Sequence, residues 1–184
     1  MNTHPPEAPD GPVPEYAAVV AEAARAVYSR VGPSTVLDVG CNIGQWCRAF
    51  SGLGCHVTGI DSPYMEPHLL APKPRFHGLD LEQPFCVGWF DLVLCLEVAE
   101  HLPASAADAL VWSVVTSGEV VLWSAAAPGQ GGWEHINEQP PEYWIEKFAP
   151  HGFEPDTTIR RMMPAGIPAY YRNNMMLFRM RGPA

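Results

Sequence analysis

The chain has 184 residues, about the length of one domain, and 47% of them are hydrophobic. This composition fits a folded globular protein and excludes an intrinsically disordered one. The net charge of −9 provides no basic surface for a nucleic acid, and no apolar run is long enough to span a membrane.

Residues 1–13 contain acids and prolines but neither a basic region nor an apolar core, so we expect a flexible leader rather than a secretory signal. We expect residues 14–184 to form a single domain, because no linker or internal repeat divides them. There are five cysteines, an odd number, without a C-x-x-C pair. Free thiols in a reduced, cytoplasmic protein explain this better than disulfides do.

Apolar spacing predicts strands and helices that alternate along most of the chain. In chain order we predict a helix at 15–31, a strand at 35–40, a helix at 43–50, strands at 56–60, 75–78 and 90–96, a helix at 104–116, a strand at 119–123, a helix at 141–148 and strands at 153–159 and 175–180. The strands are continuously apolar, which indicates a parallel sheet covered on both faces.

Residues 36–44, Val-Leu-Asp-Val-Gly-Cys-Asn-Ile-Gly, place a glycine loop between a strand and a helix. Gly40 permits a sharp turn, and Gly44 allows close packing at a helix N-terminus whose N–H groups are free. Asn42 stands where a dinucleotide-binding fingerprint needs its second glycine. Asp61 ends the next strand, 21 residues after Gly40, where a carboxylate accepts hydrogen bonds from both ribose hydroxyls.

Together these segments resemble the first two motifs of the class I S-adenosylmethionine-dependent methyltransferases, and the resemblance covers most of the chain from Thr35 onward. It implies a Rossmann-like α/β fold with a seven-stranded, mostly parallel sheet, an antiparallel last strand and helices on both faces. It also implies the cofactor S-adenosyl-L-methionine. The residues that the resemblance assigns to this cofactor are Asp38 and Gly40 at its amino-acid end, Asn42 and Gly44 in the loop, Asp61 at the ribose, Ser62 and Tyr64 near the sugar and adenine, Asp80 and Leu81 at the adenine amino group, and Glu97 after the 90–96 strand.

Acids and imidazoles follow the strand predicted at 90–96. Glu97, Glu100 and His101 form an E-x-x-E-H motif, and His135 comes after the next strand. This pattern is similar to that of the metal-dependent O-methyltransferases of ubiquinone biosynthesis and of small-RNA 3′ ends, so a divalent metal on these four side chains is one hypothesis. We prefer a metal-free reaction in which His135 is the general base, with Glu100 and His101 also catalytic, since an imidazole titrates near neutral pH. Solvated glutamates and a helix-capping His101 are the structural alternative.

For the substrate, we expect contacts from Trp133, which lies beside His135 in the sequence, and from Tyr171 and Arg172, which precede the last strand. Five of the eleven basic residues fall in the last 25 residues, and Arg172 with the pair at 160 and 161 could clamp an anionic acceptor. Ordinary surface arginines are the alternative.

We therefore predict methylation of a small-molecule acceptor, preferably at oxygen, by a protein that has no nucleic-acid or membrane partner. One alternative is a non-catalytic S-adenosylmethionine-binding regulatory subunit, which has no need of His135 or Glu100. Another is an NAD-dependent oxidoreductase, which Asn42 and Gln45 in the glycine loop disfavour. Neither the acceptor nor the oligomeric state is readable from the sequence.

Overall fold

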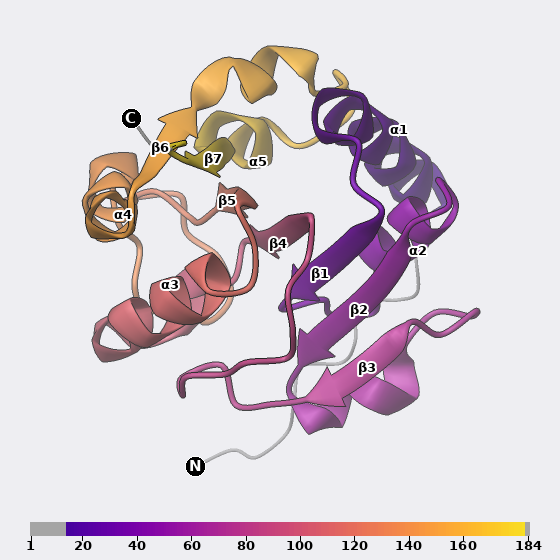
Figure 1. The fold of residues 1–184 in the computed structure, drawn as a ribbon, viewed down its shortest axis with the longest axis horizontal. Coiled ribbons are helices and arrows are strands. Elements are labelled where there is room, and N and C mark those ends of the chain that lie inside the picture. Colours follow the sequence, from indigo (N-terminus) through magenta and orange to yellow (C-terminus); the bar gives the residue numbers. More distant parts are fainter. Residues whose placement is uncertain (1–13, 183–184) are drawn as a thin grey trace.

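A computed structural model describes residues 14–182, which form a seven-stranded sheet with the strand order β3-β2-β1-β4-β5-β7-β6 (Figure 1). The strands are β1 (Thr35–Val39), β2 (His56–Asp61), β3 (Arg75–Gly78), β4 (Leu92–Leu96), β5 (Val120–Ser124), β6 (Phe153–Asp156) and β7 (Met176–Met180). Strands β1 to β5 pair in parallel, whereas β7 runs antiparallel to both β5 and β6. The predicted Rossmann-like fold with an antiparallel last strand is confirmed. The leader predicted at residues 1–13 lies outside the described residues.

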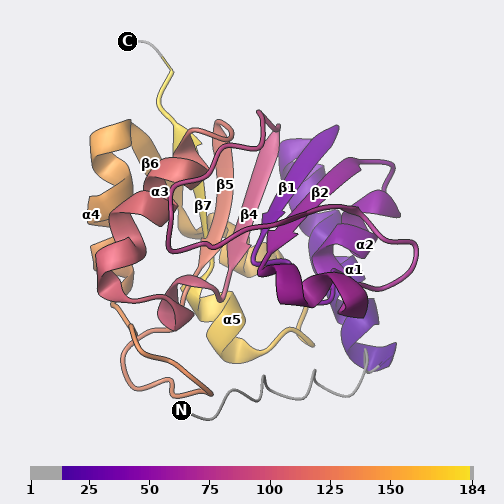
Figure 2. The same cartoon turned by 90° about the horizontal axis from the view of Figure 1, so that it is seen from below.

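Helices cover both faces of the sheet (Figures 1 and 2). One face carries α1 (Pro14–Val31), α2 (Gln45–Ser51) and α5 (Ala169–Asn174), and the other carries α3 (Ala107–Val115) and α4 (Pro141–Phe148). None of the helices in these described residues combines the length and the apolar character needed to cross a lipid bilayer.

The central strand β4 shows why its apolar run is continuous. Leu92, Leu94 and Leu96 pack into the core beneath α1 and α2, while Val93 and Cys95 pack into the core beneath α3 and α4. Successive side chains of a strand point to opposite faces, so a strand covered on both faces must be apolar at every position.

Trp144 and Phe148 lie one helical turn apart on α4 and are fully buried against the Trp123 ring, at centroid distances of 4.9 and 5.2 Å. These two aromatic side chains are therefore part of the core. The five cysteines are all free, and four of them are buried.

Three segments differ from the elements predicted from the sequence: one strand is shorter, one helix was not predicted, and one helix begins with a 3-10 turn. The strand predicted at 153–159 ends at Asp156, because the Asp156 carboxylate accepts the N–H of Thr158 at 2.8 Å and starts a 3-10 helix, Thr157–Met162. The polar segment at 170–174 is helical: it forms α5, which begins directly after Pro168. The helix predicted at 104–116 begins with a 3-10 turn, Ala104–Ala106, before α3.

Candidate functional site

The parallel strands β1, β2, β4 and β5 end at one edge of the sheet, and the loops after them form the candidate site. In Figure 2 the long loop between β5 and α4 hangs below the sheet, near α5. Backbone hydrogen bonds join neighbouring loops: the N–H groups of Gly40 and Cys41 donate to the carbonyl of Ile60 at 2.8 and 3.1 Å. The N–H of Glu97 donates to the carbonyl of Ser124 at 3.0 Å, which holds the ends of β4 and β5 together.

The glycine loop after β1 contains three left-handed residues: Gly40, Asn42 and Gly44 have φ angles of 70°, 49° and 83°. A Cβ atom on Gly40 would lie 2.3 Å from Cγ2 of Val98, so only a glycine fits between β1 and the segment after β4. Asparagine tolerates left-handed angles better than most residues, which explains Asn42. The left-handed angles and the close approach to Val98 thus account for the residues of this loop.

Asp61, the last residue of β2, accepts two backbone hydrogen bonds through separate oxygens. The N–H of Asn42 lies 2.7 Å from Oδ2, and the N–H of Ser62 lies 2.7 Å from Oδ1. Each carboxylate oxygen keeps a further lone pair, so the side chain is still able to accept two hydroxyl groups. Burial raises the pKa of Asp61, against the lowering effect of the two N–H donors.

Asp38 lies beneath the glycine loop and is only 3% exposed. The thiol of Cys47 donates to its Oδ2 at 3.1 Å. Burial raises the pKa of the Asp38 carboxyl to about 7, although the Cys47 hydrogen bond opposes that shift. A cationic group brought next to Asp38 would favour its ionised form, so the carboxyl is suited to an ammonium partner.

The residues predicted at the sugar and adenine lie along the edge formed by β2 and β3. Ser62 and Tyr64 are exposed, and Tyr64 belongs to the 3-10 helix Pro63–His68 that follows β2. Asp80 is exposed and accepts the N–H of Glu82 at 3.0 Å, whereas Leu81 is buried in the core. Asp80 is therefore free to accept a further donor, and Leu81 contributes apolar packing.

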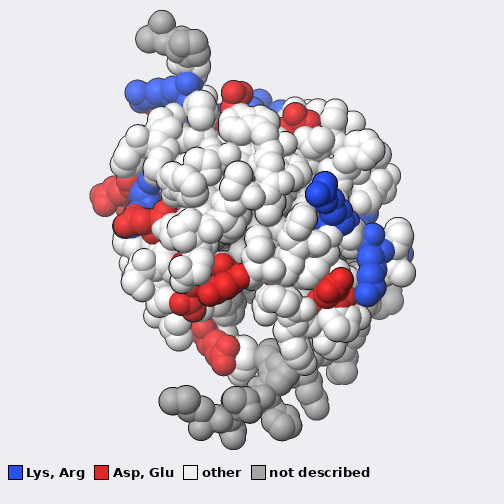
Figure 3. Space-filling view, turned by 60° about the horizontal axis from the view of Figure 1, so that its bottom comes forward, with Lys and Arg blue, Asp and Glu red and all other residues white. Residues whose placement is uncertain are grey.

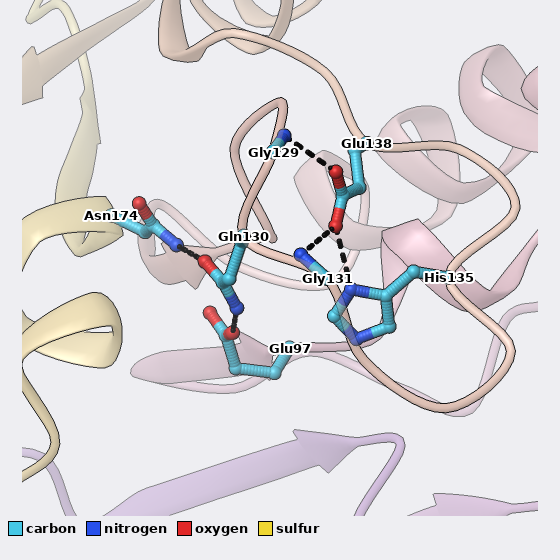
Figure 4. A network of polar contacts seen from close by, with 7 residues as sticks. All are labelled: Glu97, Gly129, Gln130, Gly131, His135, Glu138 and Asn174. Atoms are coloured by element: carbon cyan, nitrogen blue, oxygen red, sulfur yellow. Dashed lines mark hydrogen bonds and ion pairs between the residues drawn. The ribbon is translucent and has the colours of Figure 1, made fainter.

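Glu97 follows β4 with a left-handed φ of 55°, an unusual angle for a glutamate. Its Oε2 accepts the side-chain N–H of Gln130 at 3.1 Å, and the Gln130 carbonyl in turn accepts the Asn174 amide at 2.8 Å (Figure 4). Gln130 thus links the end of β4 to α5 through the loop after β5.

Glu100, His101 and His135 come together at the same edge. They offer ligand atoms that all lie within 4.8 Å of one another, and the two imidazole rings meet edge to face at a centroid distance of 5.0 Å. Glu100 is fully buried, and within residues 14–182 neither of its carboxylate oxygens has a hydrogen-bond partner. Burial, and then the negative charge of Glu97, raise the pKa of Glu100 to about 8. Burial also lowers the pKa of His101, and the adjacent His135 adds to this.

His135 is held by a second acid. Its Nδ1 lies 3.1 Å from Oε1 of Glu138, and the same carboxylate accepts the N–H groups of Gly129 at 2.8 Å and Gly131 at 2.6 Å (Figure 4). The hydrogen bond to His135, followed by that from Gly129, lowers the pKa of Glu138. The imidazole therefore faces an ionised acceptor.

The residues predicted to bind substrate have different environments. Trp133 is 58% exposed on the loop that carries His135. Tyr171 is 7% exposed, and its hydroxyl accepts the indole N–H of Trp46 at 3.2 Å, so its side chain packs in the core. Tyr171 was predicted as a contact because the buried face of α5 was not recognised.

The three arginines at 160, 161 and 172 have different environments. The Nε of Arg160 donates to the carbonyl of Met175 at 2.8 Å, and Arg161 is exposed. Arg172 is two positions from Asn174 on α5, and residues two apart on a helix do not share a face. In Figure 3 the largest group of acidic side chains lies at the lower left of the face, and other acidic side chains lie at the top and beside the basic side chains on the right.

Three site residues were not predicted: Gln130, Glu138 and Asn174. The spacing of three between His135 and Glu138 and the glycines on either side of Gln130 are visible in the sequence. Asn174 has no such signal, because its contact depends on α5 packing near a loop 44 residues earlier in the chain.

Comparisons with known proteins agree with this geometry. The model of a family described as a methyltransferase domain matches residues 14–112. The ubiquinone biosynthesis O-methyltransferase of Bordetella bronchiseptica is 31% identical in a comparison over 158 residues that covers 73% of this chain and 54% of that protein. A protein of the same name from Xylella fastidiosa is 36% identical over 88 residues, or 39% of this chain and 33% of that protein. The chain thus spans about half or less of the length of these curated relatives.

Solved structures share the fold at low identity. Magnesium protoporphyrin IX methyltransferase from Synechocystis superposes with a TM-score of 0.67 at 19% identity, covering 91% of this chain and 84% of that one. A sugar N-methyltransferase from Streptoalloteichus gives a TM-score of 0.64 at 19% identity, covering 89% and 88%. The matched family model covers more than half of the chain and places it in the methyltransferase domain family, and the solved structures show that it has the fold of the class I S-adenosylmethionine-dependent methyltransferases.

Proposed function

We propose that this chain transfers a methyl group from S-adenosylmethionine to an oxygen atom of a small molecule. The observation that carries the proposal is the convergence of Glu100, His101 and His135 at the sheet edge, where Val98 contacts the glycine loop. Acid and imidazole side chains are suited to accept the proton of a hydroxyl group. The names of the sequence relatives, ubiquinone biosynthesis O-methyltransferases, support oxygen as the acceptor atom.

The residues present fit S-adenosylmethionine. Asp61 keeps lone pairs for the two ribose hydroxyls, and Gly40 lets the loop after β1 pack closely against Val98 at the same edge of the sheet. The buried Asp38 is suited to the cofactor's ammonium group. When bound, the cofactor supplies an electrophilic methyl group. The protein's own part is to align the acceptor oxygen and to remove its proton.

His135 is the proposed general base. Its Nδ1 is hydrogen-bonded to Glu138, so Nε2 is the nitrogen that takes the proton. Glu100, with a pKa of about 8, is largely protonated at neutral pH and lies beside the two imidazoles without adding a full negative charge. His101 contacts the His135 ring and limits its movement.

The same three side chains also fit a divalent ion. Transition metals accept a donor set of two imidazoles and one carboxylate. The carboxylate here, that of Glu100, has no hydrogen-bond partner among the described residues. Glu100, His101 and His135 would hold such an ion, which would lower the pKa of an acceptor hydroxyl. We favour the metal-free base, because Glu97, the fourth predicted ligand, accepts a hydrogen bond from Gln130.

The positions of the arginines favour an uncharged acceptor over an anionic one. The Nε of Arg160 already donates a hydrogen bond to the carbonyl of Met175, and Arg172 lies on the side of α5 away from Asn174. The net charge of −9 also disfavours a nucleic-acid partner. A cytoplasmic location remains a prediction, supported by the free cysteines.

Two measurements test the proposal. Calorimetry should show binding of S-adenosylhomocysteine, and mass spectrometry of hydroxylated small molecules incubated with S-adenosylmethionine should show a gain of one methyl group. Binding of NADH without binding of either S-adenosyl compound would refute the cofactor. Cofactor binding without turnover on any acceptor would favour the regulatory alternative.

A further inference from the structure

We propose that Glu138 is a positioning residue that fixes the orientation and the tautomer of His135. The inference rests on the proposed role of His135 as base and extends it to a residue with no other assigned role. The carboxylate and the imidazole lie three positions apart on the loop between β5 and α4. Their side chains are 11% exposed for His135 and 19% for Glu138.

The loop holds the Glu138 carboxylate in place through its backbone. Gly129 and Gly131 have left-handed φ angles of 85° and 67° and direct their N–H groups to separate oxygens of Glu138. Successive N–H groups in such a conformation form a concave anion-binding site. Both glycines therefore bind the carboxylate of Glu138, an anion from the same chain.

The charge of Glu138 determines which His135 nitrogen carries the proton. An ionised carboxylate only accepts hydrogen bonds, so Nδ1 of His135 must be the donor. In the neutral imidazole Nε2 then has a free lone pair. This is the tautomer that a general base requires.

Gly132 leaves space on the other side of the ring. A Cβ atom at this position would lie 2.3 Å from Nε2 of His135 and 2.4 Å from Cε1. Any side chain at 132 would therefore displace the His135 ring from its position. The Gly129–Gly132 run thus binds Glu138 and gives room to His135.

The loop itself is anchored at both ends. Gln130, between the two N–H donors, bonds to Glu97 and Asn174 (Figure 4). The N–H groups of Ile136 and Asn137 donate to the carbonyl of Glu100 at 2.9 and 3.1 Å. The Glu138–His135 pair is therefore fixed relative to β4 rather than to the loop alone.

The test is the Glu138→Gln variant, which keeps the size of the side chain. A carboxamide has one acceptor oxygen for three N–H donors, so at least one donor loses its partner. In the full chain, with chelator present, nitrogen-15 NMR of the imidazoles should show His135 with a proton on Nδ1 and a bare Nε2. The resonances are assigned by their loss in His135→Ala. Glu138→Gln should produce a mixture of tautomers.

In turnover assays Glu138→Gln should lower kcat by about 10- to 100-fold with KM within about twofold, as loss of an orienting partner does. Glu146→Gln, at an exposed position of α4, makes the same change of charge and should leave both readouts unchanged. An unaltered His135 tautomer together with unaltered kcat in Glu138→Gln would overturn the inference. If the wild-type chain methylates no acceptor, the proposed function fails, but the NMR comparison still decides the role of Glu138.

Discussion

Gly40 and Val98 approach so closely that a Cβ atom on Gly40 would lie 2.3 Å from the Val98 Cγ2. Gly40→Ala should therefore destabilise the protein and impair cofactor binding, because overpacking and a left-handed alanine act together. Urea unfolding should show a loss of about 2–5 kcal/mol, and calorimetry should show weakened binding of S-adenosylhomocysteine.

A matched control separates the two causes. Gly54 has a φ of 89°, but a Cβ atom added there would meet nothing within 4 Å, so Gly54→Ala measures backbone strain alone. It should cost about 1–2 kcal/mol and leave cofactor affinity unchanged. Val98→Ala combined with Gly40→Ala should recover part of the loss, and equal effects at both glycines would contradict the packing argument.

Asp61 is predicted to hold the ribose of the cofactor. Asp61→Ala should weaken binding of S-adenosylhomocysteine by about 1–3 kcal/mol, since buried hydroxyl groups lose their acceptor. Asp91 is the control, because it also accepts two backbone N–H groups, from Ser34 and Thr35, but at the opposite end of the sheet. Asp91→Ala should lower stability without changing affinity. Equal affinity in the Asp61 variant would remove the ribose assignment.

His135 is the proposed proton acceptor. With chelator present, wild-type turnover should persist, and His135→Ala should lower kcat by about 10²- to 10⁴-fold, the usual contribution of a general base. His151→Ala, an exposed histidine after α4, should behave like the wild type. Loss of turnover on chelation, with recovery on adding Mn²⁺ or Zn²⁺, would show that a metal acts instead. Full activity of His135→Ala would contradict both mechanisms.

The Asp38 pKa of about 7 lies above its ordinary value of 3.8, which gives a defined pH dependence. As pH rises from about 4 to 7, the unfolded chain releases a proton that the folded chain retains. The free energy of unfolding of the ligand-free protein should fall over this range, and Glu100, whose pKa is raised to about 8, should add a decrease of the same sign. Urea titrations of Asp38→Asn should show a smaller decrease that leaves only the contribution of the other raised carboxyls. The variant should therefore gain stability over the wild type as pH rises from 4 to 7, and an unchanged pH dependence would argue against a protonated Asp38.

Most of the sheet could be predicted from the sequence, because strands buried on both faces, such as β1, β4 and β5, are nearly continuous runs of apolar residues. The sequence also placed Glu97, Glu100, His101 and His135 after strands that end at one edge of a parallel sheet, and the structure brings the last three of them together. The burial of Tyr171 was missed because α5 is short and surrounded by polar residues. Long-range packing places that side chain against Trp46, and no local pattern encodes the contact.

Strand β7 also affects the order in which the protein can assemble during synthesis. Residues 153–156 of β6 leave the ribosome well before residues 176–180, yet β7 is the strand that joins β6 to β5. In that interval the hydrogen-bonding edge of β5 has no partner, and the apolar surface that Met176, Leu177 and Phe178 later cover is open to water. Unpaired strand edges of this kind invite aggregation. A nascent chain halted in that interval is the form we expect chaperones to recognise.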